Sequence, residues 1–304
     1  MSRRTAPPPR NYFGIPESGS GRRERPPAHH DRLLADPETI TGAVELGIRV
    51  LEPVHVGSGA FGLHQGRVVK EPVRRRELLV IPGSSLKGMC RQIVEALTAS
   101  DSPFDPRARY RAPPHGDPPR PVSAASALFG ALGYQGRVSF DDAVPAEALH
   151  PEEIALSVPY PPQKPVGRRF YGDPPRGADQ PPSIGALAIP GGSLLLSTLR
   201  FRNLDRRELG EVFLGLGVDR FAPRLGGGKY DGFGRVEIVP RGYRLRPRGF
   251  RRSRGWQRDS AELTAFVDGC LGAVELDASA REVLSVLQRK LPLPAPGEDR
   301  KDRP

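Results

Sequence analysis

The part of this chain best suited to binding chemistry is residues 81–88, which read IPGSSLKG. Apolar residues before it suggest a strand, and apolar residues after it recur at helical spacing, which predicts a helix that starts here. A helix N-terminus favours an anion, and Ser84 or Ser85 would cap the helix and add hydroxyl donors. Lys87 and Arg91, four residues apart, add cations on one side. The pattern predicts a phosphate-binding site; an amphipathic helix with solvated cations is the alternative.

Two glycine-rich loops are further candidates for binding a ligand. The first, residues 56–59, contains Gly57 and Ser58 and follows a predicted strand. The second, residues 225–234, reads LGGGKYDGFG. Glycine lets a backbone approach a ligand closely, a lysine supplies charge, and a tyrosine supplies a face for stacking bases. The candidate contacts of the second loop are Gly227, Gly228, Lys229 and Tyr230. The alternative is a tight hairpin turn.

A third candidate lies in the proline-rich stretch at residues 159–182. Arg168 and Arg169 precede an aromatic pair there. Arginine beside aromatic rings suits single-stranded RNA, through stacking and cation–π contacts. An exposed surface loop without a ligand would have the same composition.

Catalytic chemistry has little support in the sequence. Asp141 and Asp142 are adjacent on a predicted strand, so their side chains should point to opposite faces and could not share a metal. The histidines lie apart from any serine, cysteine or lysine that would suggest a base and its target. They are His55, His64, His115 and His150, with His29 and His30 near the N-terminus. We expect no catalytic group, no metal and no cofactor.

The composition bounds the class of protein. The 304 residues carry a net charge of +11, which points to a polyanionic partner, although an arginine-rich genome would have a similar effect. Cys90 and Cys270 are far apart, so neither a disulfide framework nor a structural zinc is expected, and a reducing cytoplasm fits. No apolar run approaches the length of a membrane span.

Hydrophobic periodicity divides the chain into three parts. Residues 1–41 have the composition of a disordered basic tail rich in proline and glycine. Residues 42–240 alternate predicted strands and helices, with loop insertions at 101–121 and 159–182. Residues 241–304 comprise an arginine-rich linker, with eight arginines up to position 258, and two C-terminal helices. The order of elements predicts an α+β sandwich of ferredoxin type, one sheet backed by helices.

Four of these predicted elements have sharp signals. Alternation over residues 44–50 predicts a half-buried strand, and residues 193–201 predict another. The clearest apolar stripe predicts a helix after Ser85. Asp205 and Glu208 have capping-box spacing, so a helix should begin between them.

Several motifs together resemble the RAMP superfamily of CRISPR-associated proteins. Residues 81–88 with the arginine that follows resemble the signature of that family, and residues 127–130 with 136–143 resemble its LFG and GR-hydrophobic-x-F-x-D-A segment. Residues 225–236 resemble its C-terminal glycine-rich loop, and residues 55–59 resemble its first-strand loop. The order of the motifs matches too, and the resemblance covers residues 44–239.

The resemblance implies a ferredoxin-like, RRM-type domain that assembles with other CRISPR effector subunits around a guide RNA, facing target RNA. Within that family, the chain resembles the backbone subunits of type III effector complexes in antiviral defence. Residues 159–182 would correspond to the thumb-like insertion of those subunits. Target-cleaving subunits have an aspartate in the loop before the signature helix. Residues 60–76 contain no aspartate here. We therefore expect an RNA-binding subunit without cleavage activity.

Two alternatives stay open at this point. An endoribonuclease could cut target RNA or process guide RNA, with Glu71 or Asp231 on a metal ion, or with His55 or His64 as a base. A general RNA-binding protein of RRM type is less well supported, because the RNP aromatic signature is absent.

Overall fold

The computed structural model describes most of the chain between residues 38 and 295. The described residues are 12–15, 23–24, 38–100, 121–157, 168–173, 183–247 and 255–295. Most of the two predicted loop insertions lies outside them.

The main sheet has the ferredoxin-like order. Its long strands are β3 (Ile40–Val50), β16 (Leu194–Leu204) and β17 (Val236–Leu245), and β11 (Val138–Phe140) pairs with β16 at one edge. The spatial order is β11-β16-β3-β17, with all pairs antiparallel, and the short β12 (Val144–Pro145) also pairs with β16. With α1 (Gly83–Leu97) after β3 and α3 (Arg206–Gly215) after β16, the succession is βαββαβ. The predicted α+β ferredoxin-like fold is confirmed.

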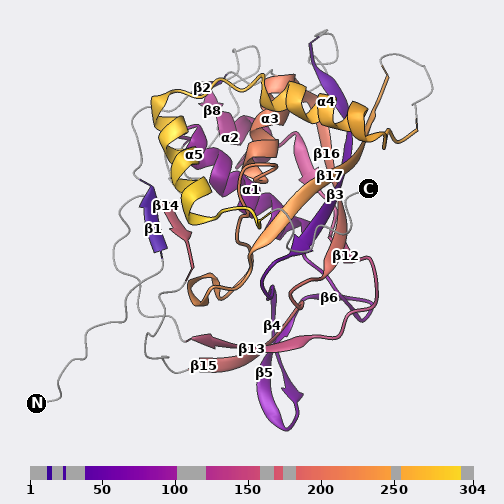
Figure 1. Cartoon of the computed structure of the whole chain (residues 1–304), viewed down its shortest axis with the longest axis vertical. Coiled ribbons are helices and arrows are strands. Elements are labelled where there is room, and N and C mark those ends of the chain that lie inside the picture. Colours follow the sequence, from indigo (N-terminus) through magenta and orange to yellow (C-terminus); the bar gives the residue numbers. More distant parts are fainter. Residues whose placement is uncertain are drawn as a thin grey trace, which may run out of the picture.

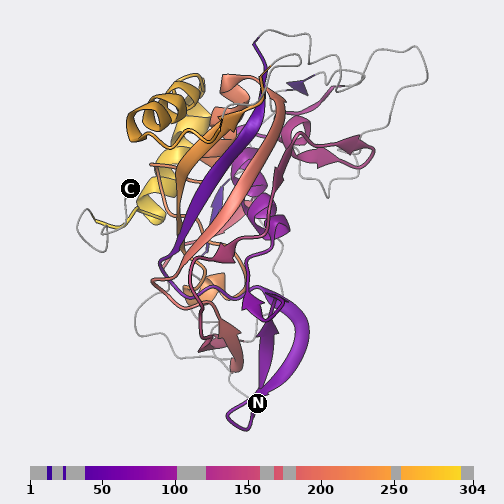
Figure 2. The same ribbon diagram turned by 90° about the vertical axis from the view of Figure 1, so that its right-hand side faces the viewer.

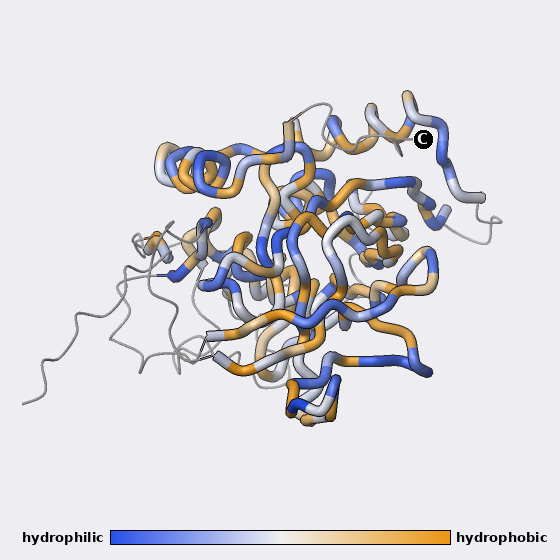
Figure 3. The backbone as a smooth tube through the Cα atoms, turned by 60° about the horizontal axis from the view of Figure 1, so that its bottom comes forward, coloured by the Kyte–Doolittle hydropathy of each residue, from blue (hydrophilic) through white to orange (hydrophobic). Residues whose placement is uncertain are grey.

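One face of the main sheet is apolar and carries the helices. Alternate residues of β3, Val44, Leu46 and Ile48, are fully buried, and their partners include Leu195 and Leu199 on β16. This period of two confirms the strand that the sequence predicted over 44–50. The strand begins earlier than predicted, at Ile40. Figure 1 shows α1, α3 and α5 on one side of the sheet, and Figure 3 shows hydrophobic and hydrophilic residues alternating along the backbone.

The helices begin where local capping chemistry allows. Asp205 and Glu208 form the predicted capping box at the start of α3. The two C-terminal helices are confirmed as α4 (Ser260–Leu271) and α5 (Ala278–Lys290), capped by Asp259 and Asp277. Phe266 of α4 stacks on Tyr243 of β17, with ring centroids 4.2 Å apart. In the described part of the chain, no helix combines the length and apolar character that crossing a bilayer would need.

A second, smaller sheet forms a lobe below the main sheet in Figure 1. Its strands are β4 (Gly57–His64), β5 (Arg67–Pro72), β13 (Glu152–Ser157) and β15 (Ser183–Ala188), in the order β13-β15-β5-β4. The lobe is thus built from two segments far apart in sequence. Its own core has four buried residues, Ile154, Leu156, Ala186 and Ala188.

Parts of the N-terminal segment are ordered, which corrects the prediction of a wholly disordered tail. Strand β1 (Tyr12–Ile15) pairs with β14 (Arg168–Tyr171), which the sequence had assigned to a loop. Phe13 stacks on Phe170 at 5.8 Å, and Ile15 is buried in the main core. Burial of these apolar side chains explains the order. The rest of residues 1–37, apart from β2, lies outside the described residues.

Short pairings complete the described structure. Strand β2 (Arg23–Glu24) pairs with β8 (Val122–Ser123), and β6 (Arg74–Arg75) pairs with β7 (Leu78–Leu79). The helix α2 (Ala124–Phe129) leads into β9 (Gly130–Ala131), which pairs with β10 (Tyr134–Gln135). Both cysteines are buried free thiols.

Candidate nucleic-acid interface

The tip of α1 is capped by a residue from elsewhere in the chain. The N-cap is Pro82, and no side chain of the helix caps it, so the predicted cap by Ser84 or Ser85 is wrong. Instead, Asp142 Oδ1 accepts a hydrogen bond of 2.9 Å from the Gly83 N–H. That bond, together with Arg75 on the other carboxylate oxygen, lowers the pKa of Asp142. The helix dipole therefore already faces one internal negative charge.

Because Asp142 caps the helix, the hydroxyls of Ser84 and Ser85 are not used as caps. Ser84 is exposed and Ser85 is half-buried, and neither hydroxyl has a partner among the described residues. Lys87 is half-buried, and no carboxylate among the described residues forms an ion pair with it. Burial, and after it the positive charge of Arg91, lowers the pKa of Lys87. Gly88 is exposed, and a Cβ there would meet nothing within 4 Å. The tip thus has unused donors and open space.

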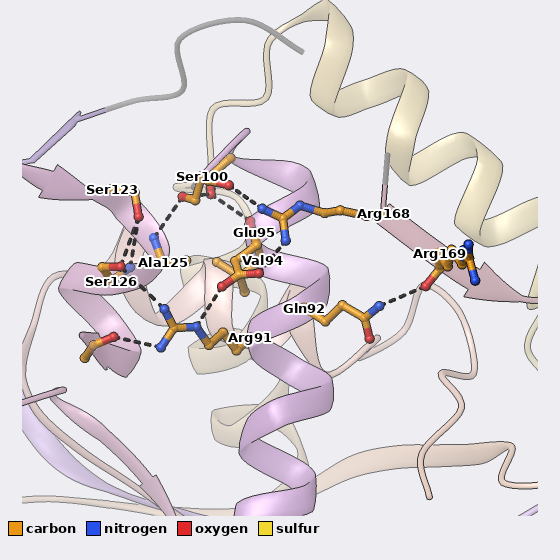
Figure 4. Close-up of polar contacts among 12 residues, drawn as sticks. Arg91, Gln92, Val94, Glu95, Ser100, Ser123, Ala125, Ser126, Arg168 and Arg169 are labelled. Carbon is orange, nitrogen blue, oxygen red and sulfur yellow. Dashed lines mark hydrogen bonds and ion pairs between the residues drawn. The ribbon is translucent and has the colours of Figure 1, made fainter. Parts of the chain in front are cut away.

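Arg91 points into the protein. Its Nε donates to Glu95 Oε1 at 2.7 Å, and its Nη1 donates to the Gly130 carbonyl at 2.7 Å. Arg168 approaches Glu95 from the other side and also donates to the Ser100 carbonyl (Figure 4). The two guanidinium groups thus join α1 to α2 and β14. Both side chains are mostly buried, and both form ion pairs with Glu95. Their contact with RNA stays a prediction.

Arg169 lies with the N-terminal strand. Its guanidinium carbon is 5.2 Å from the centre of the Tyr12 ring, and its carbonyl accepts from Gln92 Nε2 at 2.8 Å. The predicted pairing of arginine with an aromatic ring is present, but the ring belongs to this chain. Its contact with RNA stays a prediction.

The second glycine-rich loop is packed against the lobe. Gly228 has φ of +69°, and a Cβ there would lie 2.5 Å from Leu156. The Tyr230 hydroxyl donates to the Ser157 carbonyl, and Asp231 accepts from the Ser157 N–H at 3.0 Å. Gly228 therefore serves a close contact within the chain. Contact of Gly227 or Gly228 with RNA stays a prediction.

The titratable groups of this loop are partly buried. They lie on the short 3₁₀ helix η3 (Lys229–Asp231). Burial lowers the pKa of Lys229, and burial followed by the charge of Asp231 raises the pKa of Tyr230 to about 12. Tyr230 is therefore a neutral hydrogen-bond donor. Contact of either side chain with RNA stays a prediction.

A series of backbone hydrogen bonds connects this loop to Val80, which lies three residues before the start of α1. The Gly227 N–H donates to the His55 carbonyl at 2.8 Å, and the Val73 N–H donates to the carbonyl of Val56 at 2.8 Å. The Val80 N–H then donates to the Val73 carbonyl at 3.4 Å. Each of the three bonds spans one strand spacing of about 4.8 Å, so Gly227 and Val80 lie roughly 15 Å apart. The loop and the tip of α1 therefore lie at the same end of the main sheet.

The first glycine-rich loop lies between them. Gly57 pairs with Pro72 at the start of the β4–β5 hairpin, and Gly57 and Ser58 are exposed. The Ser58 hydroxyl donates to the Glu71 carbonyl at 3.0 Å. We call Gly57, Ser58, Ser84, Ser85, Lys87 and Gly88 the tip surface.

The residues considered for catalysis have structural partners. Asp141 binds Arg200, and Asp142 caps α1, so the two carboxylates point in different directions as predicted. His55 is buried, with Nδ1 2.7 Å from the Leu187 carbonyl. Across the described ranges, no cluster of three or more histidine, cysteine, aspartate or glutamate residues could hold a metal ion.

Arg224 was not singled out from the sequence, yet it holds the glycine-rich loop. Its buried guanidinium donates to Glu52 and Asp173, and to the carbonyls of Gly232 and Phe233. No local pattern identifies it, because its carboxylate partners are 172 and 51 positions away. Asp142 was equally hidden, 59 positions from the glycine that it caps.

Comparison with known proteins agrees with this geometry. The model of the RAMP superfamily matches residues 48–237, which contain α1, α3, β11, β16 and both glycine-rich loops, with the end of β3 and the start of β17. The chain belongs to the RAMP superfamily. No curated protein gave a significant match. Membership of this superfamily supports a CRISPR-associated protein that binds or processes RNA, with RNA and CRISPR proteins as its partners.

Proposed function

We propose that this RAMP protein is an RNA-binding subunit of a type III CRISPR effector complex, which holds guide RNA beside target RNA and does not cut it. The observation that carries the proposal is the tip surface, where two free hydroxyls, a lysine and an unhindered glycine gather at a helix N-terminus. These groups suit a ribose-phosphate backbone, because they offer donors and one positive charge without a shape that selects a base.

The contacts follow from the capping arrangement. Asp142 takes the Gly83 N–H, so a phosphate at the tip would be held by the hydroxyls of Ser84 and Ser85 and by Lys87. Lys87 is already partly desolvated, and a phosphate beside it would compensate for that cost. Gly88 would allow the RNA backbone to approach the helix closely. Recognition of this kind is independent of sequence, as a subunit that holds many different guides requires.

The absence of cleavage is supported by what surrounds the alternative residues. Asp231 accepts two hydrogen bonds from Ser157, and His55 is buried against Leu187. Glu71 lies 4.0 Å from the Arg74 guanidinium. Glu71 and His55 border the tip surface, because the Glu71 carbonyl accepts from Ser58 and the His55 ring lies against Gly57. The partners of their side chains within the chain, and not their distance from that surface, support the absence of cleavage.

Binding of labelled single-stranded RNA to the purified chain, followed by anisotropy at several salt concentrations, tests the proposal. A combined Ser84→Ala and Lys87→Gln variant should bind several-fold more weakly. Its salt slope should be shallower by about 0.7, the value for one phosphate contact on single strands. Lys290→Gln, at the exposed end of α5, is the matched control and should leave both quantities unchanged. Equal binding by the tip variant and the control would contradict the proposal.

Gly88→Gln separates binding from folding. Glycine in an exposed helix interior costs about 1 kcal/mol relative to good helix formers, so this variant should be more stable than the wild type. The added side chain occupies the open space at the tip and should weaken RNA binding. A more stable variant that binds RNA normally would show that the backbone does not approach there.

Cleavage is tested in the assembled complex with labelled target RNA, with and without magnesium. We expect this subunit to leave the target intact. Cleavage that disappears in Glu71→Ala or His64→Ala would overturn that part of the proposal and favour an endoribonuclease.

A further inference from the structure

The main sheet has a second face that no described helix covers. Glu45 alternates with the buried residues of β3, and its partners Thr198 and Gly242 lie on the same side. Figure 2 views the sheet from this side, with β3, β16 and β17 in front of the helices. This face is therefore separate from the side on which α1 packs.

The segment after β17 extends this face. Gln257 pairs with Tyr243 through two backbone hydrogen bonds of 3.0 and 2.8 Å, which places residues 256–258 alongside β17. In this antiparallel register Trp256 lies beside Arg244, whose guanidinium carbon is 5.1 Å from the ring centre. Residues 256–258 and Arg244 lie outside residues 48–237, which match the family model.

Two arginines lie over this tryptophan ring, Arg244 and Arg258, the latter with its guanidinium carbon 5.9 Å from the ring centre, and two more lie on the same face of the sheet. Arg258 makes a two-pronged ion pair with Glu45, and Arg200 makes one with Asp141. The side chain of Arg241 crosses over Gly47, with its Cδ 3.0 Å from where a Cβ would lie. We call Arg200, Arg241, Arg244, Trp256 and Arg258 the arginine face.

The charge on this face is only partly balanced. Two acids, Glu45 and Asp141, stand against four arginines. Neither Arg241 nor Arg244 has a carboxylate partner in the portion of the chain that the structure describes, and Arg244 lies on the tryptophan ring. Among the described residues, the face therefore has two guanidinium groups without a carboxylate partner, one over the indole and one over Gly47.

We propose that the arginine face binds a second stretch of single-stranded RNA, separately from the tip surface. Guanidinium groups bind phosphates in pairs of hydrogen bonds and stack on bases, and an indole offers a platform on which a base can stack. A protein partner would be expected to bury the exposed apolar side chains Val144 and Leu196, which lie beside Gly47. The unpaired arginines and Trp256 favour RNA.

The chain provides its own local reporter, because Trp256 is its single tryptophan. A base that stacks on the indole would quench its fluorescence, whereas RNA held only at the tip surface would not. The experiment titrates the full chain with a single-stranded uridine oligonucleotide, and follows tryptophan fluorescence together with the anisotropy of a label on the RNA. Each variant is normalised to its own fluorescence without RNA.

The decisive variant is Arg241→Gln with Arg244→Gln. It should bind RNA several-fold more weakly, lower the salt slope by about 1.4 for two phosphate contacts, and lose most of the quenching. The control, Arg289→Gln with Lys290→Gln, removes the same charge from the exposed last turn of α5 and should retain the quenching. Melting curves of both variants confirm that each is folded.

The outcomes separate this inference from the proposed function. RNA that binds the wild type without quenching Trp256, or that quenches the double variant fully, would overturn the arginine face as an RNA site. Loss of a CRISPR partner protein, and not of RNA, in the double variant would overturn it too. Quenching that survives Lys87→Gln supports the arginine face. Normal binding by Lys87→Gln, together with weak binding by the double variant, would count against the tip surface alone.

Discussion

The helix-covered side of the main sheet and the smaller lobe differ in how deeply their side chains are buried. Beneath the main sheet, Arg137 is buried and bound to Glu208. On the lobe, Phe61, Leu63 and Val68 are 60%, 78% and 59% exposed. The open face of the main sheet also leaves Val144 and Leu196 exposed, so the contrast is between the helix-covered side of that sheet and the lobe hairpin.

Strand register explains why the lobe is only half covered. A row of paired residues crosses it from Ile154 through Ala186 and Lys70 to Phe61, so these four side chains share one face. Phe233 of the glycine-rich loop packs on the buried end of that face. The other end has no cover among the described residues. The lobe thus depends on the loop for its small core, and the tip surface lies where the lobe meets the main sheet.

The largest expected effect tests the buried charge. Arg137 donates to Glu208 and to the carbonyls of Ala127 and Asn203. Arg137→Met should lower the free energy of unfolding by about 3–5 kcal/mol, because the carboxylate of Glu208 is left buried without its partner. Urea unfolding, followed by circular dichroism, measures the loss.

Arg200→Met is the control for that prediction. Its ion pair with Asp141 is exposed on both sides, so the loss should stay below about 1 kcal/mol. If Arg137→Met and Arg200→Met had the same free energy of unfolding, the buried ion pair would contribute no more to stability than the exposed one.

A smaller effect is expected in the lobe. Leu156→Ala removes a buried side chain from its four-residue core and should cost about 2 kcal/mol, the low end for such truncations, because a small core can close around the gap. Hydrogen exchange should quicken in β13 and β15 while α1 and α3 stay protected, because the lobe opens locally.

Leu209→Ala, on the buried side of α3 in the main core, is the matched truncation. It should quicken exchange throughout the main body. Uniform acceleration by Leu156→Ala as well would mean that lobe and body unfold as one unit.

The smallest effect concerns the cap of α1. Asp142→Ala should cost about 1 kcal/mol near neutral pH, as for other lost helix caps. The folded-state pKa of Asp142 is lowered, so its charge stabilises the fold above its unfolded pKa of about 4, and that contribution is lost as pH falls below it.

The difference in unfolding free energy between wild type and Asp142→Ala should therefore shrink on acidification. Asp142→Asn retains an acceptor for the Gly83 N–H and should flatten the same pH dependence. A difference that stays constant from neutral pH to below pH 4 would show that the charge of Asp142 does not matter.

Local signals in the sequence were sufficient for the fold. Alternation located β3 and β16, and the spacing of Asp205 and Glu208 located the start of α3, because these patterns are read within a few residues. The family resemblance held for the same reason, since its motifs are contiguous. The prediction failed for β1, because its partner strand is more than 150 positions away.

The sequence did not show which candidate side chains have partners within the chain. The hydroxyls of Ser84 and Ser85 have none among the described residues, whereas Arg91 and Arg168 are held by Glu95. An arginine on a helix looks the same in a sequence whether it faces water or a buried carboxylate.

From the sequence alone came the order of strands and helices, the positive charge and the family motifs, because these depend on neighbouring residues. The tertiary structure alone decided which polar groups stay free. Asp142 replaces the serines as the cap of α1, and the glycines of the second loop fit against Leu156. Partners of this kind meet only when distant segments pack together, so which polar side chains remain without a partner cannot be read from the sequence.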